Sequence, residues 1–143
     1  MNNYFVILAA GKSKRFKAKI AKQFHNYKNK EIIEHSIEKS LNSRLFKKII
    51  IVTNNLKYFK KKRYSKFINV IKGGKERSDS SLKALKFLRK FKPQNVYIHD
   101  AARPNFSIKL LKKISKNLKK NKAVVPMIYS KDSSKYKYKG EFF

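Results

Sequence analysis

The stretch that decides the fold runs from residue 4 to residue 15 and reads Tyr-Phe-Val-Ile-Leu-Ala-Ala-Gly-Lys-Ser-Lys-Arg. Its apolar first half is typical of a strand buried in a parallel sheet, and its small and basic second half is typical of a turn that approaches phosphate. A second apolar run, residues 95–98, leads in the same way into His99-Asp-Ala-Ala-Arg-Pro. The first loop offers consecutive N–H groups and cations, and the second brings a carboxylate to the same edge of the sheet. Together the two loops predict nucleotide chemistry with a metal ion.

The length of the chain, 143 residues, suits one domain with a real core and is too short for two ordinary ones. The chain has no cysteine, which excludes disulfides, a thiol nucleophile and a cysteine metal site. No apolar stretch approaches the roughly 20 residues of a membrane span, and the start of the chain lacks the pattern of a secretory signal. We therefore expect a soluble, cytoplasmic protein without a membrane partner.

The formal net charge is +30, from 38 lysine and arginine residues against 8 acidic ones. Such an excess favours polyanionic partners, among them nucleic acid and phosphorylated small molecules. However, the excess is nearly all lysine, whereas sequence-reading nucleic-acid modules rely on arginine for bidentate contacts. Compositional drift alone would scatter lysine over every element in this way, so we expect only non-specific nucleic-acid binding. A basic nucleic-acid-binding domain is the alternative from another class, with the Tyr-Lys alternation near the end of the chain as a candidate for base stacking.

Strand-like and helix-like segments alternate along the chain. The strand candidates are short and rich in Val, Ile, Phe or Tyr, and they cover residues 4–8, 48–53, 67–71, 95–99 and 123–128. The helix candidates carry apolar residues every three or four positions, and they cover residues 31–41, 78–91 and 107–118. In the second of them the stripe is Leu82, Leu85, Leu88 and Phe91, and in the third Ser107 is the candidate N-cap. This order predicts a doubly wound α/β fold with a mostly parallel sheet, in which ligands bind beyond the carboxyl ends of the strands.

The first loop carries residues suited to a triphosphate. Ala9, Ala10 and Gly11 are small enough for a nucleotide to approach the backbone. Arg15 and Lys22 could neutralise the charge that develops at the α-phosphorus. The pattern G-x-x-x-x-G-K-[ST] is absent from the chain, which disfavours a P-loop ATPase.

Three blocks of residues, in this order, resemble the signatures of sugar-phosphate cytidylyltransferases. The first is L-A-A-G-x-x-x-R at residues 8–15, followed by K-Q-F at residues 22–24. The second is G-G-x-x-R-x-x-S at residues 73–80, and the third is H-D-A-A-R-P at residues 99–104. The blocks are most similar to those of the 2-C-methyl-D-erythritol 4-phosphate cytidylyltransferase family of the non-mevalonate isoprenoid pathway. The relatives that act on ribitol 5-phosphate are the second choice, because their first loop more often reads A-G-G.

The resemblance implies a Rossmann-like fold and a reaction in which CTP and a polyol phosphate give a CDP-polyol and pyrophosphate, with Mg²⁺ or another divalent cation. Arg15 and Lys22 match the family's transition-state stabilisers at the α-phosphate. Asp100 and Arg103 match a strand-end pair beside the nucleotide, and Asp100 is the candidate metal ligand. The positions that surround cytosine and ribose in the family correspond to Ala9, Ala10, Gly11, Gly74, Lys75 and Ser80. Because the acceptor phosphate is itself the nucleophile, catalysis would rest on positioning and charge neutralisation.

Several of these residues also have a purely structural interpretation. Asp100 could cap the turn that follows it, Ser80 could be a hydroxyl at a helix N-terminus, and Arg77 could be an ion-pair partner. The chain also departs from the family at Ser13, where the family has a glycine, and at Ala21, where it has a proline. Either departure could weaken CTP binding without abolishing the fold.

We expect residues 1–143 to form one CTP-binding nucleotidyltransferase domain that is incomplete at its C-terminal end. Residues 135–143 alternate polar and aromatic side chains up to Gly140 and then stop, which predicts that residues 129–143 begin a β-arm for dimerisation. In the family the C-terminal half supplies the rest of this arm and the residues that hold the acceptor. A homodimer or a partner chain would have to supply that side here, so we predict poor turnover by the chain alone. An inactive remnant of the fold is the remaining alternative.

Overall fold

Strand β1 (Asn3–Leu8) is the centre of the fold, and all six of its residues are buried. A computed structural model describes residues 2–11, 20–59, 65–128, 137–138 and 141–142. In it β1 lies between β4 (Lys48–Thr53) and β6 (Asn95–Asp100), parallel to both. A fourth parallel strand, β5 (Ile68–Lys72), pairs with the far side of β4, so that the strand order is β5-β4-β1-β6. The wholly apolar run predicted from the sequence is therefore a central parallel strand covered on both faces.

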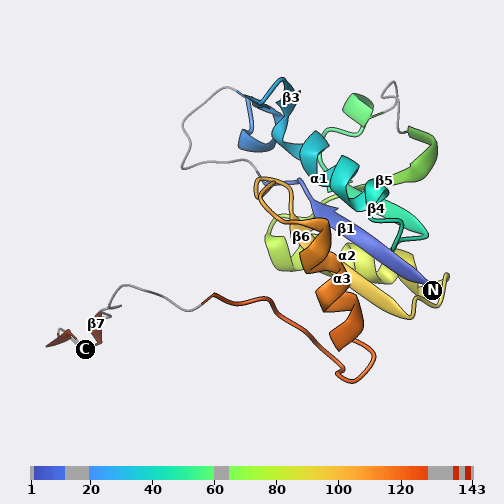
Figure 1. Cartoon of the computed structure of the whole chain (residues 1–143). Coiled ribbons are helices and arrows are strands. Elements are labelled where there is room, and N and C mark those ends of the chain that lie inside the picture. Colours follow the sequence, from blue (N-terminus) through green and yellow to red (C-terminus); the bar gives the residue numbers. More distant parts are fainter. Residues whose placement is uncertain (1, 12–19, 60–64, 129–136, 139–140, 143) are drawn as a thin grey trace.

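Helices cover both faces of this sheet (Figure 1). On one face α1 (Ile32–Asn42) and α3 (Ile108–Asn117) pack against a core that includes Phe5 and Ile7 of β1. On the other face α2 (Arg77–Arg89) packs against the residues of β1 that alternate with these. Successive side chains of a strand point to opposite faces, so β1 contributes to both cores. The doubly wound, mostly parallel α/β fold predicted from the sequence is confirmed.

Short elements fill the connections between the strands and helices. They are η2 (Lys22–Phe24), β2 (Asn26–Tyr27), β3 (Lys30–Glu31), η3 (Lys57–Phe59), η4 (Ser65–Phe67), β7 (Lys137–Tyr138) and β8 (Glu141–Phe142). Strands β7 and β8 pair antiparallel in the segment for which a β-arm is predicted, whereas the role of that arm in dimerisation stays a prediction. In the part of the chain that the structure describes, no helix has the length and apolar character needed to cross a bilayer.

The predicted helices and the first four predicted strands all form, within two residues of their expected bounds. The cap of α3 is also as predicted, because the Ser107 hydroxyl accepts a hydrogen bond from the Leu110 N–H at 3.1 Å. The stripe predicted for α2 is correct at Leu88, which is buried, and wrong at Leu82 and Leu85, which are 52% and 42% exposed. The other buried residues of the helix are Ser80 and Ala84. Residues spaced three apart move around a helix of 3.6 residues per turn faster than residues spaced four apart. Ser80, Ala84 and Leu88 are spaced four apart and so stay close to the face that meets the sheet.

The strand predicted at residues 123–128 is also wrong. These residues form no strand, and the side chains of Val125, Met127 and Ile128 are 77%, 87% and 94% exposed. Figure 1 shows the chain running away from the sheet after α3. A strand must exchange backbone hydrogen bonds with a neighbour, and no described strand lies beyond β6 in the sheet order. The β-propensity of these residues is therefore not sufficient to form a strand here.

Candidate active site

The loop after β1 is held by polar side chains that bind its carbonyl groups. The Gln23 amide donates to the carbonyl oxygen of Ala9 at 2.9 Å and to that of Gly11 at 3.2 Å. The Asn54 amide donates to the carbonyl oxygen of Ala10 at 3.3 Å. Gly11 itself is exposed, and a Cβ built on it meets no atom of the described residues within 4 Å. The described part of the loop is thus fixed through the carbonyl groups of Ala9, Ala10 and Gly11.

Sequence reasoning gave Gln23 no role, although it stands next to Lys22 in the K-Q-F block. Its side chain is among the few buried polar ones, with an exposed fraction of 4%. A buried amide is retained where it satisfies backbone groups, and here it satisfies two carbonyls of the loop. A glutamine flanked by a cation and an aromatic residue carries no local signal for such a long-range bond.

The second block, residues 73–80, packs tightly against the first. A Cβ built on Gly73 would lie 2.2 Å from the Cβ of Ala10, and one built on Gly74 would lie 2.2 Å from the Cβ of Asp79. Both positions therefore need glycine because other atoms approach so closely. The Ser80 hydroxyl accepts a hydrogen bond from the Gly74 N–H at 3.0 Å, which fixes the second glycine to the first turns of α2.

The acidic residues of this block serve the helix. Glu76 is the N-cap of α2, and its side chain accepts a hydrogen bond from the N–H of Asp79. In return the Asp79 carboxylate accepts one from the Glu76 N–H at 3.1 Å. This capping box satisfies donors at the start of the helix. It accounts for both acids without a ligand.

The third block places a carboxylate between two arginines at the carboxyl end of β6. The Nε atom of Arg77 lies 2.8 Å from Oδ1 of Asp100, and the Nε atom of Arg103 lies 3.3 Å from Oδ2. The Asp100 side chain is 31% exposed, against 63% for Arg77 and 79% for Arg103. Arg77 is therefore an ion-pair partner, as one of its two sequence interpretations proposed. It comes from α2, and so it links the second block to the third.

These three blocks surround one cleft of about 760 Å³ at the carboxyl ends of the strands. Its lining is formed by Leu8, Ala10, Gly11, Lys22, Gln23, Gly74, Lys75, Glu76, Arg77, Ser80, Asp100, Ala101, Ala102 and Arg103. The structure thus brings together eight of the predicted site residues, and their roles toward a ligand stay predictions. Ala9 lies beneath the cleft and is buried. Arg15 lies outside the residues that the structure describes.

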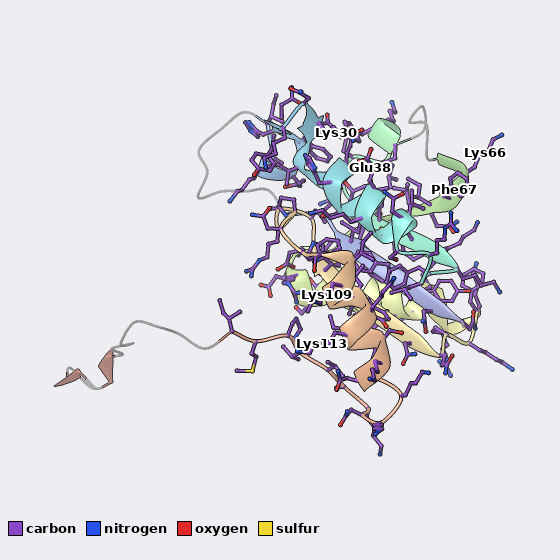
Figure 2. All side chains as sticks on the ribbon, in the orientation of Figure 1. Lys30, Glu38, Lys66, Phe67, Lys109 and Lys113 are labelled. Carbon is purple, nitrogen blue, oxygen red and sulfur yellow. The ribbon has the colours of Figure 1, made fainter. Side chains whose placement is uncertain are left out.

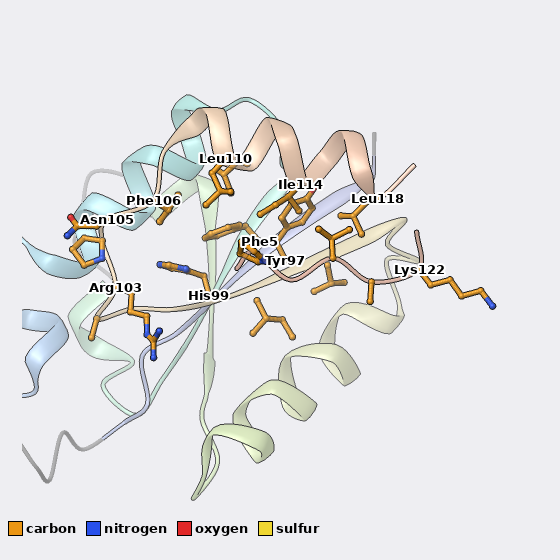
Figure 3. A pocket seen from close by; sticks show the side chains of 18 residues that line it. Phe5, Tyr97, His99, Arg103, Asn105, Phe106, Leu110, Ile114, Leu118 and Lys122 are labelled. Carbon is orange, nitrogen blue, oxygen red and sulfur yellow. The ribbon is translucent and has the colours of Figure 1, made fainter. Parts of the chain in front are cut away.

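His99 precedes Asp100 but faces the opposite side of the sheet. Its ring packs against the rings of Phe5 and Phe106, with centroids 5.7 and 4.6 Å away, and its Nε2 atom lies 3.4 Å from the Ser36 hydroxyl (Figure 3). Burial in this environment lowers the pKa of His99 below the usual value for histidine. The ring therefore packs on the side of α1 and α3, and it also has a hydrogen bond to the backbone of Arg103 in the loop after β6.

A second, mainly apolar groove of about 690 Å³ lies on that other side (Figure 3). It runs between β6, the inner face of α3 and the extended residues 122–126, and Tyr97, Leu110 and Ile114 are among its lining side chains. The predicted charged and small site residues lie almost wholly around the first cleft. The second groove marks the edge of the sheet, where β6 ends the strand order.

The lysines are spread over the molecule. Figure 2 shows Lys30 on β3 and Lys66 on η4, well apart from Lys109 and Lys113, which both lie on α3. One of them, Lys30, makes an ion pair with Glu38 at 2.6 Å. A dispersed distribution of this kind agrees with compositional drift and not with a dedicated nucleic-acid face.

The fold and the position of the cleft place this protein in the class of doubly wound, Rossmann-like domains, which bind ligands at the carboxyl ends of parallel strands. A solved structure with the same fold is 4-diphosphocytidyl-2C-methyl-D-erythritol synthase from Anaerococcus prevotii DSM 20548. Its TM-score is 0.79 at 26% identity, over 96% of this chain and 60% of that one. Residues 4–140 match the family described as IspD, 2-C-methyl-D-erythritol 4-phosphate cytidylyltransferase. The chain belongs to this family.

Two curated relatives show how much of the family's length the chain covers. The bifunctional enzyme IspD/IspF of Pelagibacter ubique (strain HTCC1062) is 47% identical over 96% of this chain. The 2-C-methyl-D-erythritol 4-phosphate cytidylyltransferase of Thermotoga neapolitana is 31% identical over 92% of it. The matched region spans 37% of the first relative and 60% of the second.

Proposed function

We propose that this chain carries the nucleotide side of a cytidylyltransferase that joins CTP to 2-C-methyl-D-erythritol 4-phosphate and releases pyrophosphate. The observation that carries the proposal is the convergence of the three family blocks on one cleft, although they are far apart in the sequence. Family membership over residues 4–140 supports the choice of cytidine and of this acceptor.

The chemistry needs little from the protein beyond position and charge. An oxygen of the acceptor phosphate attacks the α-phosphorus of CTP, a P–O bond forms, and the bond to the pyrophosphate leaving group breaks. The attacking group is already an anion, so no side chain has to remove a proton. In this proposal Lys22 of the cleft, together with Arg15, stabilises the charge that builds up on the α-phosphate. In the same proposal the phosphates approach the exposed backbone at Gly11.

The cleft fits a divalent cation that arrives with the nucleotide. In the described residues, no group of three or more histidine or acidic side chains could enclose a metal ion. Mg²⁺ in nucleotide enzymes needs no such cage, because one or two carboxylates act together with substrate phosphates and water. Asp100 is the carboxylate of the cleft that could serve, and a bound cation would supply neutralisation of phosphate charge. We propose Mg²⁺ as the cation and Asp100 as its protein ligand.

The test is a calorimetric titration of CTP into the purified chain with Mg²⁺ at moderate salt, with ATP as the comparison nucleotide. We expect saturable binding of CTP and markedly weaker binding of ATP. Lys22→Ala and Arg15→Ala should each lower the affinity for CTP about tenfold or more, since a hydrogen bond to a charged group is worth roughly 1.5–3 kcal/mol. Lys109→Ala removes the same charge from the remote helix α3 and is the matched control. Equal, salt-dependent heats for both nucleotides, unchanged in the Lys22 and Arg15 variants, would refute the proposal.

The same titration, repeated with an oligonucleotide, distinguishes the proposed function from the nucleic-acid-binding alternative. A basic chain binds oligonucleotides through charge alone, with an affinity that falls steeply with salt. If the cleft holds CTP, bound CTP should leave most of this weak oligonucleotide binding intact, since Lys22 and Lys75 are the only lysines, among the described residues, that line the cleft. Tight oligonucleotide binding by a chain that does not bind CTP would favour the alternative.

Assembly is the third part of the proposal. We propose that the acceptor is held with the help of a second copy of the chain or of a partner chain. The apolar groove beside the outer edge of β6 supports this idea, because it leaves an accessible surface next to the sheet. Sedimentation velocity over a range of protein concentrations would detect such a dimer, and a monomer at all concentrations would count against it. Location in the cytoplasm stays a prediction from the sequence.

A further inference from the structure

Arg77 joins two walls of the cleft through its ion pair with Asp100. It is the first residue of α2, and Asp100 is the last residue of β6. The ion pair between them, at 2.8 Å, spans 23 positions of the sequence, and both partners line the cleft. Arg103, from the loop after β6, takes the other oxygen of the same carboxylate at 3.3 Å.

The charges of the cleft show what this pair does in the absence of a ligand. The ionic side chains that line it are Lys22, Lys75, Arg77, Arg103, Glu76 and Asp100, four basic and two acidic. Glu76 is engaged in the helix cap. Asp100 is therefore the one lining carboxylate, among the described residues, that is not used in this cap. Without Arg77 beside it, that carboxylate would repel the phosphates of an incoming nucleotide.

The two partners differ in how readily they can leave each other. Arg77 is a long side chain that is 63% exposed, whereas Asp100 is 31% exposed and fixed to the end of a strand. An exposed ion pair adds little to stability, because water and salt compete with it. A guanidinium group binds phosphate at least as well as carboxylate, through two parallel N–H donors. Arg77 can therefore change its anion at small cost, and Asp100 stays in place.

We propose that Arg77 is a positioning residue that exchanges anions when the nucleotide binds. In the empty cleft it neutralises Asp100. When CTP and a divalent cation enter together, Arg77 transfers to the phosphates and Asp100 Oδ1 becomes available to the cation. This inference rests on the proposed function. It makes the benefit of the divalent cation and the benefit of Arg77 depend on each other.

The experiment measures CTP affinity by calorimetry, with Mg²⁺ and with EDTA, in four forms of the chain. They are the wild type, Arg77→Gln, Asp100→Asn and the double variant. For Arg77→Gln we expect about a tenfold loss of affinity with Mg²⁺ and less than about a threefold loss in EDTA, because without the cation Arg77 is still held by Asp100. For Asp100→Asn we expect stronger binding in EDTA than the wild type shows, and little further gain on adding Mg²⁺.

Controls separate this exchange from a structural role. Arg89→Gln removes the same charge from the far end of α2 and should change CTP affinity less than about twofold in either condition. Arg77→Lys keeps the charge and should recover part of the affinity with Mg²⁺. Thermal unfolding of each variant shows whether it is folded. If Arg77 only connects α2 and β6 structurally, its substitution would lower the unfolding temperature without changing the effect of Mg²⁺ on CTP affinity.

The calorimetric results distinguish failure of the anion exchange from failure of the proposed function. If the wild type binds CTP selectively but Arg77→Gln loses the same factor with Mg²⁺ and with EDTA, the exchange is refuted and the proposed function stands. A failure of Asp100→Asn to strengthen binding in EDTA refutes it as well. If the wild type does not prefer CTP over ATP, the proposed function fails and the exchange fails with it.

Discussion

Replacing Gly73 by alanine places a methyl group where the first and second blocks of the site touch. The new Cβ would lie 2.2 Å from the Cβ of Ala10, against an optimal separation of about 3.5–4.0 Å between such atoms. The loops would have to part by about 1.5 Å. The Cβ of Ala10 is bonded directly to the backbone and cannot rotate away. We therefore expect a cost near the upper end of the range for overpacking, about 3 kcal/mol, and a fall in Tm of roughly 10 °C.

Urea and thermal unfolding followed by circular dichroism measure this loss. The second variant is the double substitution Ala10→Gly with Gly73→Ala, which moves the methyl group from one loop to the other. The next atoms near the new Cβ are Ser80 Oγ at 3.3 Å and Asn54 Oδ1 at 3.4 Å, so the double variant should recover most of the loss. The number of glycines is unchanged in the double variant, so the two backbone-entropy effects largely offset each other. Any remaining loss should be small and come from the 3.3 Å approach of the new Cβ to Ser80 Oγ. Gly11→Ala is the control with nothing within 4 Å. A Gly73→Ala protein as stable as the wild type, or a double variant no more stable than the single one, would show that the reasoning is wrong.

Two further predictions concern the core and the histidine. Leu88→Ala, at a fully buried site of α2, should lower the free energy of unfolding by about 2–5 kcal/mol. Leu85 is 42% exposed on the same helix, so Leu85→Ala should change this free energy by less than about 0.5 kcal/mol. Equal effects of the two substitutions in urea unfolding would contradict the observed packing of the helix. Burial lowers the pKa of His99, so the unfolded chain takes up a proton near pH 6.5 before the folded one does, and stability should fall as the pH drops below about 6.5. His99→Gln should make this fall shallower between pH 7 and pH 5, and a slope identical to that of the wild type would exclude a contribution from His99.

Much of the fold could be predicted because its central elements carry strong local patterns. The unbroken apolar run of β1 indicated a parallel strand with both faces buried, and the spacing of Ile33 and Ile37 indicated the buried face of α1. Strands that alternate with helices then restrict the topology to a doubly wound sheet. These features depend on residues close together in the sequence.

The failures come from interactions with partners distant in the sequence. Residues 123–128 have the composition of a strand, but a strand forms only beside a neighbour, and none of the described strands lies beyond β6. The apolar repeat of α2 was assigned to Leu82 and Leu85, whereas the small residues Ser80 and Ala84 make the contact with the sheet. A small residue gives a weak hydrophobic signal although it permits the closest packing.

The sequence predicted which residues form the candidate site, but it did not predict the contacts between them. The blocks were evident from the sequence, and so was their common edge of the sheet. The approach of Gly73 to Ala10 and the bonds from Gln23 to the loop carbonyls depend on the order of three strands, which no local pattern states. An ion pair was one of the interpretations of Arg77 from the sequence, and only the geometry identified Asp100 as its partner.

Among the described strands, β6 has no neighbour on its outer side, and this edge links the solubility of the protein to its lysines. A strand whose outward backbone groups have no neighbour in the sheet is a template for pairing with another molecule, and Ile98 on that strand is 40% exposed. A net charge of +30 keeps molecules apart in dilute buffer. The range of that repulsion shrinks from about 10 Å at 0.1 M salt to about 3 Å at 1 M. We therefore expect the lysines to oppose self-association of this chain in dilute buffer, and we expect added salt to weaken this protection.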